Sequence, residues 1–477
     1  MLENRILWYD FETSGPHPAL DRPIQMGWQY SDQFCNAIES PKSVFVKLPS
    51  DCLPSLEAFR IHGITPQTHQ MKGISEPELA SKFRKLNTPG ITVAGYNSRS
   101  FDDRFLQNIF YRSLYDPFAW QWEDNRKRFD LFPVVIAFFV LEKESLIWPV
   151  DSNGVVRFKL DRLAPANNIS EGKAHDAAVD CFLTSQLAKK MHLHNPEFFE
   201  YAVKLSSKHF VIDLIRKYGR QRGLVEISPK VGLGKGFCRW IWIPFRRMRG
   251  HPDYFGIDLA KSPEELLSEI KNKNTSENNQ KESAIVRIAT NAQPILIEKN
   301  SLNKMQLDQI EKYDFNWSRQ SRNLDFWQKF MLSGEFKSFY QNVCSYMAFP
   351  RFDSSLDVDL SLHAKFINDS DRKILLNCPR FDPHKLKQWK PKFSDSRYDE
   401  LLFRYRARHW PGSLTPFEKR RWLKVRKIKL LNKDSGGVSW HTLNSMSRSR
   451  ITETDWREDE LPKLNQFFEW LDSLPPI

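Results

Sequence analysis

The stretch Ile6-Leu7-Trp8-Tyr9-Asp10-Phe11-Glu12-Thr13 decides the fold of the N-terminal part of this chain. Its first residues, Ile6–Tyr9, are apolar and predict a buried β-strand. Because side chains alternate between the two faces of a strand, Asp10 and Glu12 point to the same side. Carboxylates at the end of a buried strand need a cation, a partner or a proton. We therefore interpret this pair as the start of a metal site.

Two later segments supply further acids and a histidine. Asp102 begins a predicted helix that follows a predicted strand over Ile91–Gly95. His175 precedes a second helix, for which Asp176 is the expected N-cap. Asp180 falls on the buried stripe of that helix, where an acid needs a structural reason. The sequence predicts that these groups meet at one site.

Four carboxylates and one imidazole suit the hydrolysis of a phosphodiester. Two divalent cations about 4 Å apart activate a water and stabilise the charge on the phosphate and the leaving oxygen. Mg²⁺ prefers hard oxygen ligands and keeps several waters, so three or four carboxylates suffice. We predict that Asp10, Glu12, Asp102 and Asp180 bind two Mg²⁺ ions, with Mn²⁺ as a substitute. Histidine titrates near neutral pH, which makes His175 the predicted general base.

The sequence pattern predicts three domains, which matches the 477-residue length. Residues 1–195 alternate strand-like and helix-like segments, among them a strand over Val44–Lys47, and predict an α/β domain. Residues 196–348 change to short β segments and predict a β-rich module. Residues 352–477 are helical again. The polar stretch Lys271–Ser283 predicts a surface loop, whose order is left open. The predicted β segments of the module include Phe237–Pro244, Phe255–Leu259, Ile285–Thr290 and Pro294–Glu298.

The chain carries a basic excess. It has 71 Lys and Arg against 58 Asp and Glu, a net charge of +13. Such an excess favours a nucleic-acid partner, although it also serves solubility alone. The densest basic region is Leu401–Leu430, which holds Glu418 as its single acid. This region predicts a phosphate-binding surface; the alternative is a solvated helix face behind a core stripe of Phe403, Ala407 and Trp410.

Cysteine spacing and hydropathy bear on the compartment. The six cysteines show no paired C-x-x-C spacing, which favours reduced thiols over a zinc site or a disulfide framework. Charged residues near the N-terminus leave no apolar core for a signal peptide. The longest apolar run, Val134–Leu141, is far shorter than the roughly 20 residues that span a bilayer. We expect a cytoplasmic protein without a membrane partner.

The order Asp-x-Glu, Asp and His-x4-Asp resembles the DEDDh exonuclease superfamily. Within it, the chain is similar to the bacterial exonuclease I family, and the similarity spans essentially the whole sequence. The segments that carry this similarity are Phe11–Thr13, Gly15–Pro23, Gly95–Asn97, Phe101–Asp103, Asn108–Arg112, Ala174–Ala177 and Leu401–Arg408.

The resemblance implies an α/β ribonuclease H-like exonuclease domain, followed by a β-rich SH3-like domain and an all-helical C-terminal domain. It implies processive 3′→5′ hydrolysis of single-stranded DNA to 5′-mononucleotides, in DNA repair or recombination. It assigns the central metal ligand to Asp102 and leaves Asp103 to cap or to pair with a basic residue. A monomer that binds the C-terminal tail of single-stranded DNA-binding protein is also expected.

The resemblance further implies contacts with DNA. Phe118 and Trp122 are expected to stack on bases, with Trp120 turned inward; core packing is the alternative for each ring. Lys159 stands where the family leads us to expect Arg. Lysine keeps the positive charge of arginine but lacks its bidentate guanidinium group. Gln107 stands where a basic contact is expected. The predicted substrate contacts are Glu12, Thr13, Lys159, Phe118, Trp122, Arg404 and Arg408, although a strand-end turn alone also explains Thr13.

Two other functions remain open from the sequence. A DEDDh exoribonuclease that trims RNA 3′ ends would have the same fold and metals, and only the C-terminal extension argues against it. A non-catalytic protein that binds single-stranded nucleic acid would not need all five catalytic positions filled, as they are in this chain.

Overall fold

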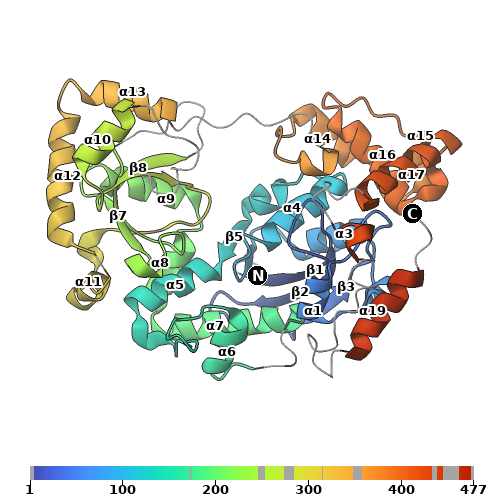
Figure 1. The fold of residues 1–477 in the computed structure, drawn as a ribbon, viewed down its shortest axis with the longest axis horizontal. Helices are drawn as coiled ribbons and strands as arrows, with labels where there is room; N and C mark the ends of the chain where they lie inside the picture. Colours follow the sequence, from blue (N-terminus) through green and yellow to red (C-terminus); the bar gives the residue numbers. More distant parts are fainter. Residues whose placement is uncertain are drawn as a thin grey trace. The chain divides into compact units, whose positions relative to one another are not determined.

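The computed structural model describes residues 5–170, 172, 175–244, 253–272, 284–313, 315–346, 357–431, 438–443 and 461–473 (Figure 1). The chain forms two compact units. The first is drawn from Met1–Arg128, Ser170–Ser185 and Phe352–Ile477, and the second from Phe129–Ile169 and Gln186–Arg351.

A five-stranded mixed sheet forms the centre of the first unit, in the order β3-β2-β1-β4-β5. β1 pairs antiparallel with β2 and parallel with β4. The predicted strands overlap β1, β3 and β4, whereas β2 and β5 were not predicted. The strand bounds are β1 (Ile6–Thr13), β2 (Pro23–Ser31), β3 (Lys42–Phe45), β4 (Thr92–Gly95) and β5 (Lys127–Asp130).

Helices pack on this sheet through buried aromatic side chains. Phe105 and Ile109 form the apolar stripe of α4, and both are fully buried. They join Tyr9 of β1 and Phe83 of α3 in one hydrophobic cluster, which fixes α4 against the sheet. Glu78 completes a capping box that starts α3. The helices of this part are α1 (Leu56–His62), α2 (Pro66–Lys72), α3 (Glu76–Leu86), α4 (Asp102–Arg112) and the start of α7 (Ala177–His194).

The C-terminal part of the first unit is helical in the part of the chain that the structure describes, as predicted. Phe403 and Ala407 of α16 are buried in a cluster with Trp422 of α17, so the predicted core stripe is confirmed at these positions. Phe467 of α19 packs on Phe59 of α1, with ring centroids 5.0 Å apart. The helices are α14 (Asp369–Leu376), α15 (Pro383–Gln388), α16 (Arg397–His409), α17 (Pro416–Leu431) and α19 (Leu461–Ser473).

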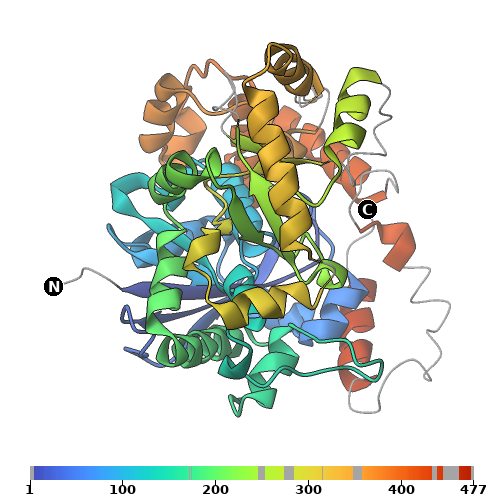
Figure 2. The same ribbon diagram turned by 90° about the vertical axis from the view of Figure 1, so that its left-hand side faces the viewer.

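The second unit contains a five-stranded antiparallel sheet in the order β10-β6-β7-β8-β9. α12 lies across this sheet (Figure 2). Trp327 of α12 stacks on Trp242 of β7, with ring centroids 6.2 Å apart. β7 to β10 overlap the predicted β segments, and β6 adds one that was not named. The strands are β6 (Leu224–Ile227), β7 (Cys238–Trp242), β8 (Tyr254–Asp258), β9 (Ile285–Ile288) and β10 (Ile295–Ile297).

The helices of the second unit correct one boundary. Lys271 and Asn272 form the end of α10, so the predicted surface loop does not include them, and its remaining residues, 273–283, lie outside the described residues. Helix propensity and the acidic first turn of α10 extend the helix into this polar stretch. The helices are α5 (Leu131–Leu141), α6 (Leu160–Ala166), α8 (Pro196–Lys204), α9 (Lys208–Leu214), α10 (Pro263–Asn272), α11 (Lys304–Glu311), α12 (Trp317–Met331) and α13 (Phe336–Tyr346).

Two expectations about the whole chain can be compared with the structure. All six cysteines are free thiols, as the spacing predicted. Among the described helices, none is both long enough and apolar enough to cross a lipid bilayer.

Candidate metal centre

β1 presents two carboxylates beyond the point where its pairing with β4 ends. The last parallel pair joins Trp8 to Ala94, so the next stretch of β1 backbone needs other partners on that side. The Phe11 amide finds one in Asp102, whose Oδ1 accepts its hydrogen at 3.0 Å. This bond holds the first residue of α4 beside Asp10 and Glu12. The hydrogen bond to the backbone of β1 thus places Asp102 beside the other two predicted ligands, Asp10 and Glu12.

The structure separates the roles of the two adjacent acids at the start of α4. Asp103 is buried and accepts hydrogen bonds from the Tyr9 hydroxyl at 2.6 Å and from Arg128 Nη1 at 2.7 Å. Its charge is therefore balanced inside the protein. Asp102 lies among the other acids, as the resemblance implied for the ligand, and Asp103 pairs with a basic residue.

The start of α7 packs on β2, which lies next to β1. Gly27 pairs with Asp10 across the ladder, and directly opposed residues point to the same face of a sheet. A Cβ at Gly27 would lie 2.0 Å from the Ala177 carbonyl oxygen, so only glycine lets α7 approach this closely. Gln25 pairs with Glu12 and accepts a hydrogen bond from the Ala177 amide at 3.1 Å. These two β2 residues were missed from sequence, because nothing in the pattern of β2 shows that α7 covers it.

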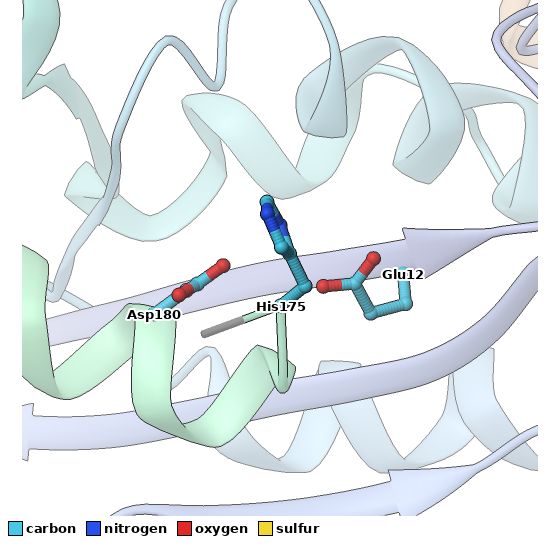
Figure 3. A group of neighbouring side chains, drawn as sticks. All are labelled: Glu12, His175 and Asp180. Carbon is cyan, nitrogen blue, oxygen red and sulfur yellow. The ribbon is translucent and has the colours of Figure 1, made fainter. Parts of the chain in front are cut away.

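This packing brings the start of α7 onto the face that carries the acids of β1. Potential ligand atoms of Glu12, His175 and Asp180 all lie within 4.8 Å of one another (Figure 3). Asp176 caps the helix, as predicted, since its Oδ1 accepts the Ala178 amide at 3.0 Å. His175 has φ of 62°, a left-handed conformation that costs a residue with a side chain about 1–3 kcal/mol. The site thus includes a strained histidine beside two carboxylates.

The four predicted ligands influence one another electrostatically. Burial, followed by the neighbouring carboxylates of Asp102 and Asp180, raises the pKa of Asp10 well above its ordinary value. Burial and then the carboxylates of Asp180 and Asp102 raise the pKa of Glu12 in the same way. Like charges held together in a poorly solvated place call for a cation or a proton. The predicted set of Asp10, Glu12, Asp102 and Asp180 is therefore brought together.

The donor set suits a hard divalent cation. Carboxylate oxygens are the ligands that Mg²⁺ and Mn²⁺ prefer, and His175 adds one nitrogen. Cys181 follows Asp180 directly, but burial and the nearby acids raise the pKa of its thiol well above the ordinary value. The thiol therefore stays protonated and is a poor ligand. The residues present fit a site of oxygen ligands.

Known proteins match most of this chain, including the part that carries this site. A family model described as "Exonuclease" matches residues 7–188, and one described as "Exonuclease I C-terminal domain" matches residues 356–474. Exodeoxyribonuclease I of Escherichia coli strain K12 is 32% identical over 438 residues, which cover 89% of this chain and 90% of that protein. The chain belongs to the exodeoxyribonuclease I family.

Solved structures of the exodeoxyribonuclease I family have the same fold. A zinc ion-bound form of an E. coli exonuclease I complex with single-stranded DNA matches with a TM-score of 0.86 and 29% identity, covering 98% of this chain and 99% of that one. A complex described as SSB/Exonuclease I with an inhibitor matches with a TM-score of 0.86 and 28% identity, with the same coverage. The predicted family and fold class are confirmed, and the chain is a nuclease with a metal-dependent exonuclease domain.

In this member of the exodeoxyribonuclease I family, the ring of Trp120 is buried and the ring of Trp122 is exposed. Trp120 is 3% exposed, as predicted, whereas the side chain of Trp122 is 58% exposed. Phe118 is partly buried and packs against Phe366, with ring centroids 5.7 Å apart. Trp122 is thus accessible to a base, and the contacts of Phe118 and Trp122 with DNA stay predictions.

Two other predicted contacts lie at polar positions. Thr13 is buried and its hydroxyl donates to the Gly15 carbonyl at 2.8 Å, which a strand-end turn explains. Lys159 precedes α6 in the second unit and lines an open cavity of about 560 Å³ together with Arg157 and Arg162. The lysine therefore belongs to a local basic group, and both contacts with DNA stay predictions.

Arg404 and Arg408 differ from the expectation of a surface that binds phosphate. The Arg404 side chain is 7% exposed and pairs with Asp357 at 2.7 Å, while that of Arg408 is 1% exposed and pairs with Asp51 at 2.7 Å. Both also contact the buried Asp359, at 3.1 and 2.6 Å. Phosphate binding would require these buried pairs to break, which costs several kcal/mol, on the order of 3–5. The structure argues against these two predicted contacts, and the exposed cations of this region lie on α17.

Proposed function

We propose that this chain is a 3′→5′ exonuclease that degrades single-stranded DNA to 5′-mononucleotides, in DNA repair or recombination. The observation that carries the proposal is the meeting of four carboxylates and His175 on one face of the sheet. Family membership supports DNA as the substrate, since related proteins carry the name exodeoxyribonuclease I and one is described in complex with single-stranded DNA.

The residues of the site divide the chemistry between them. Divalent cations, when bound by Asp10, Glu12, Asp102 and Asp180, supply positive charge to the phosphate and favour ionisation of a water. His175 lies within reach of the same place and accepts the proton of the attacking water. Attack on phosphorus breaks the bond to the O3′ atom of the preceding nucleotide. The departing O3′ takes up a proton from solvent water, so one 5′-mononucleotide leaves and the shortened strand ends in a 3′-hydroxyl group.

Several finer statements belong to the proposal. We infer two Mg²⁺ ions, replaceable by Mn²⁺, because the donor set is mainly oxygen. Thr13, Lys159, Phe118 and Trp122 contact the strand, with the exposure of Trp122 in support. The protein is a cytoplasmic monomer with domains at 1–195, 196–348 and 352–477, and it degrades its substrate processively. It binds the tail of single-stranded DNA-binding protein, as the related SSB complex suggests.

End-labelled substrates test the proposal. The protein is incubated with 3′- and 5′-labelled single-stranded DNA, duplex DNA and RNA, with Mg²⁺ or with EDTA. We expect release of the 3′ label as a mononucleotide at once, conversion of the 5′-labelled strand to short products with few intermediates, and no reaction in EDTA or with Asp180→Asn. Preference for RNA would favour the exoribonuclease alternative. Strand binding without turnover would favour a non-catalytic protein.

A further inference from the structure

Gln25 of β2 holds the segment that carries the proposed general base. Its side chain is buried, at 1% exposure, and uses both ends of the amide. The Oε1 atom accepts the Ala177 amide at 3.1 Å, and the Nε2 atom donates to Asp176 Oδ2 at 3.0 Å and to Ser43 Oγ at 3.3 Å. Because an amide offers an acceptor and a donor at once, glutamine satisfies both neighbours where glutamate or alanine cannot.

The two residues that Gln25 binds come directly after a strained one. His175 has φ of 62°, and such a conformation persists only where the surroundings fix it. Gln25 binds the side chain of Asp176 and the backbone of Ala177, and Asp176 in turn caps Ala178 at 3.0 Å. The direction of the imidazole therefore depends on a segment tied to β2.

We propose that Gln25 is a positioning residue for His175, which it holds in the direction needed to accept a proton. This inference rests on the proposed function, in which His175 is the general base. Gln25 acts through the segment of Asp176 and Ala177. The alternative is a purely structural role, in which Gln25 only docks α7 on the sheet.

The chain offers a matched control on the same strand and helix. Gln29 is also 1% exposed, and its Oε1 atom accepts the Ser185 hydroxyl at 3.0 Å, about two turns further along α7. Its Nε2 atom donates to the Glu39 carbonyl at 3.0 Å. A loss of general docking therefore affects Gln29→Ala as it affects Gln25→Ala, whereas a loss of imidazole direction affects Gln25→Ala alone.

Steady-state kinetics on single-stranded DNA with Mg²⁺ compare these variants. We expect kcat to fall between about tenfold and a hundredfold in Gln25→Ala and Gln25→Glu, because a misdirected base costs rate rather than affinity. KM should stay within about twofold of the wild type. Gln29→Ala should keep kcat and KM within about twofold. If Gln25→Ala does not fold, Gln25→Glu, which keeps the size and the acceptor, decides the question. Wild-type kcat in the Gln25 variants would overturn the inference.

A double-mutant cycle with His175→Ala separates positioning from a structural role. If Gln25 acts through His175, Gln25→Ala lowers the residual rate of His175→Ala by less than about twofold. An equal loss in both backgrounds would show a structural role and overturn the inference. In metal-free protein, amide hydrogen exchange over residues 177–180 should be faster in Gln25→Ala and unchanged in Gln29→Ala. Full kcat in His175→Ala would refute the proposed base itself, which is a different failure.

Discussion

Asp180→Asn should stabilise the metal-free protein while it removes the activity. Burial and neighbouring carboxylates raise the pKa of Glu12, with Asp180 as the largest of those neighbours. An acid whose pKa is higher in the folded state opposes folding where it is charged, which includes neutral pH. Removing the charge of Asp180 relieves part of this repulsion and leaves the shape of the side chain almost unchanged.

The magnitude follows from the distance. Ligand atoms of Glu12 and Asp180 lie within 4.8 Å, where two unit charges repel by about 3 kcal/mol at an effective dielectric constant near 20. Asp180 is partly exposed, and proton uptake by Glu12 relieves some of the repulsion, so we expect a gain of about 1–2 kcal/mol. For a domain of about 150–250 residues, a gain of this size raises Tm by about 2–6 °C.

Thermal unfolding in EDTA and in Mg²⁺ tests this expectation. In EDTA, Asp180→Asn should unfold at a higher temperature than the wild type. Mg²⁺ at about 100 times its Kd should stabilise the wild type by about 2.7 kcal/mol and the variant by less. Asp103→Asn is the control with the opposite sign, because Asp103 accepts bonds from Tyr9 and Arg128 and its loss lowers Tm. A lower Tm for Asp180→Asn in EDTA, with an unchanged response to Mg²⁺, would refute the reasoning.

Four further changes have expected outcomes. His175→Ala should lower the rate of hydrolysis in single-turnover assays by about 10²–10⁴ and should keep the affinity for DNA. An unchanged rate would show that His175 is not the general base. Asp51→Asn removes one of the two buried carboxylates that pair with Arg408 and Lys429, leaving Asp359 to neutralise both cations, and should lower the free energy of unfolding by about 3–5 kcal/mol in a denaturant titration. The pKa of Asp51 is lower in the folded protein than its unfolded value of about 3.9. The ionised Asp51 therefore adds to the free energy of unfolding of the wild type above pH 4, and this addition is lost as the pH falls further. A free energy of unfolding that does not change in acid would contradict this. The methyl group of Gly27→Ala would collide with the backbone of α7, so this substitution should lower the free energy of unfolding by about 3 kcal/mol or more and should also lower the activity. Trp122→Ala should weaken DNA binding by about 1–3 kcal/mol in anisotropy titrations at unchanged Tm; equal affinity would remove it from the contacts.

Local patterns in the sequence were sufficient for much of the first unit. The strand Ile6–Tyr9 was predicted from its apolar run, and the structure continues it to Thr13 with Asp10 and Glu12 on one face. The helix that begins at Asp102 was predicted from its place after a strand and is confirmed. These features depend on residues close together in the chain, so periodicity suffices to predict them.

The support of the site could not be predicted in this way. β2 alternates apolar residues with Gln25, Gly27, Gln29 and Ser31, a pattern that does not show that its polar face is also buried. Gln25 meets its partner Ala177 only in the folded chain. Arg404 and Arg408 stand in a basic segment, but their counterions Asp51 and Asp359 are distant in sequence. Counting charges along the chain identifies the cations and not the acids that neutralise them.

Anomalous diffraction from crystals soaked in Mn²⁺ tests the central claim most directly, because it locates the cations without reference to activity. We predict peaks among the carboxylates of Asp10, Glu12, Asp102 and Asp180 in the wild type, and weakened or missing peaks in Asp180→Asn. Wild-type crystals with no peak at these four residues, or with a peak at Asp103 in place of Asp102, would contradict the assignment of this site.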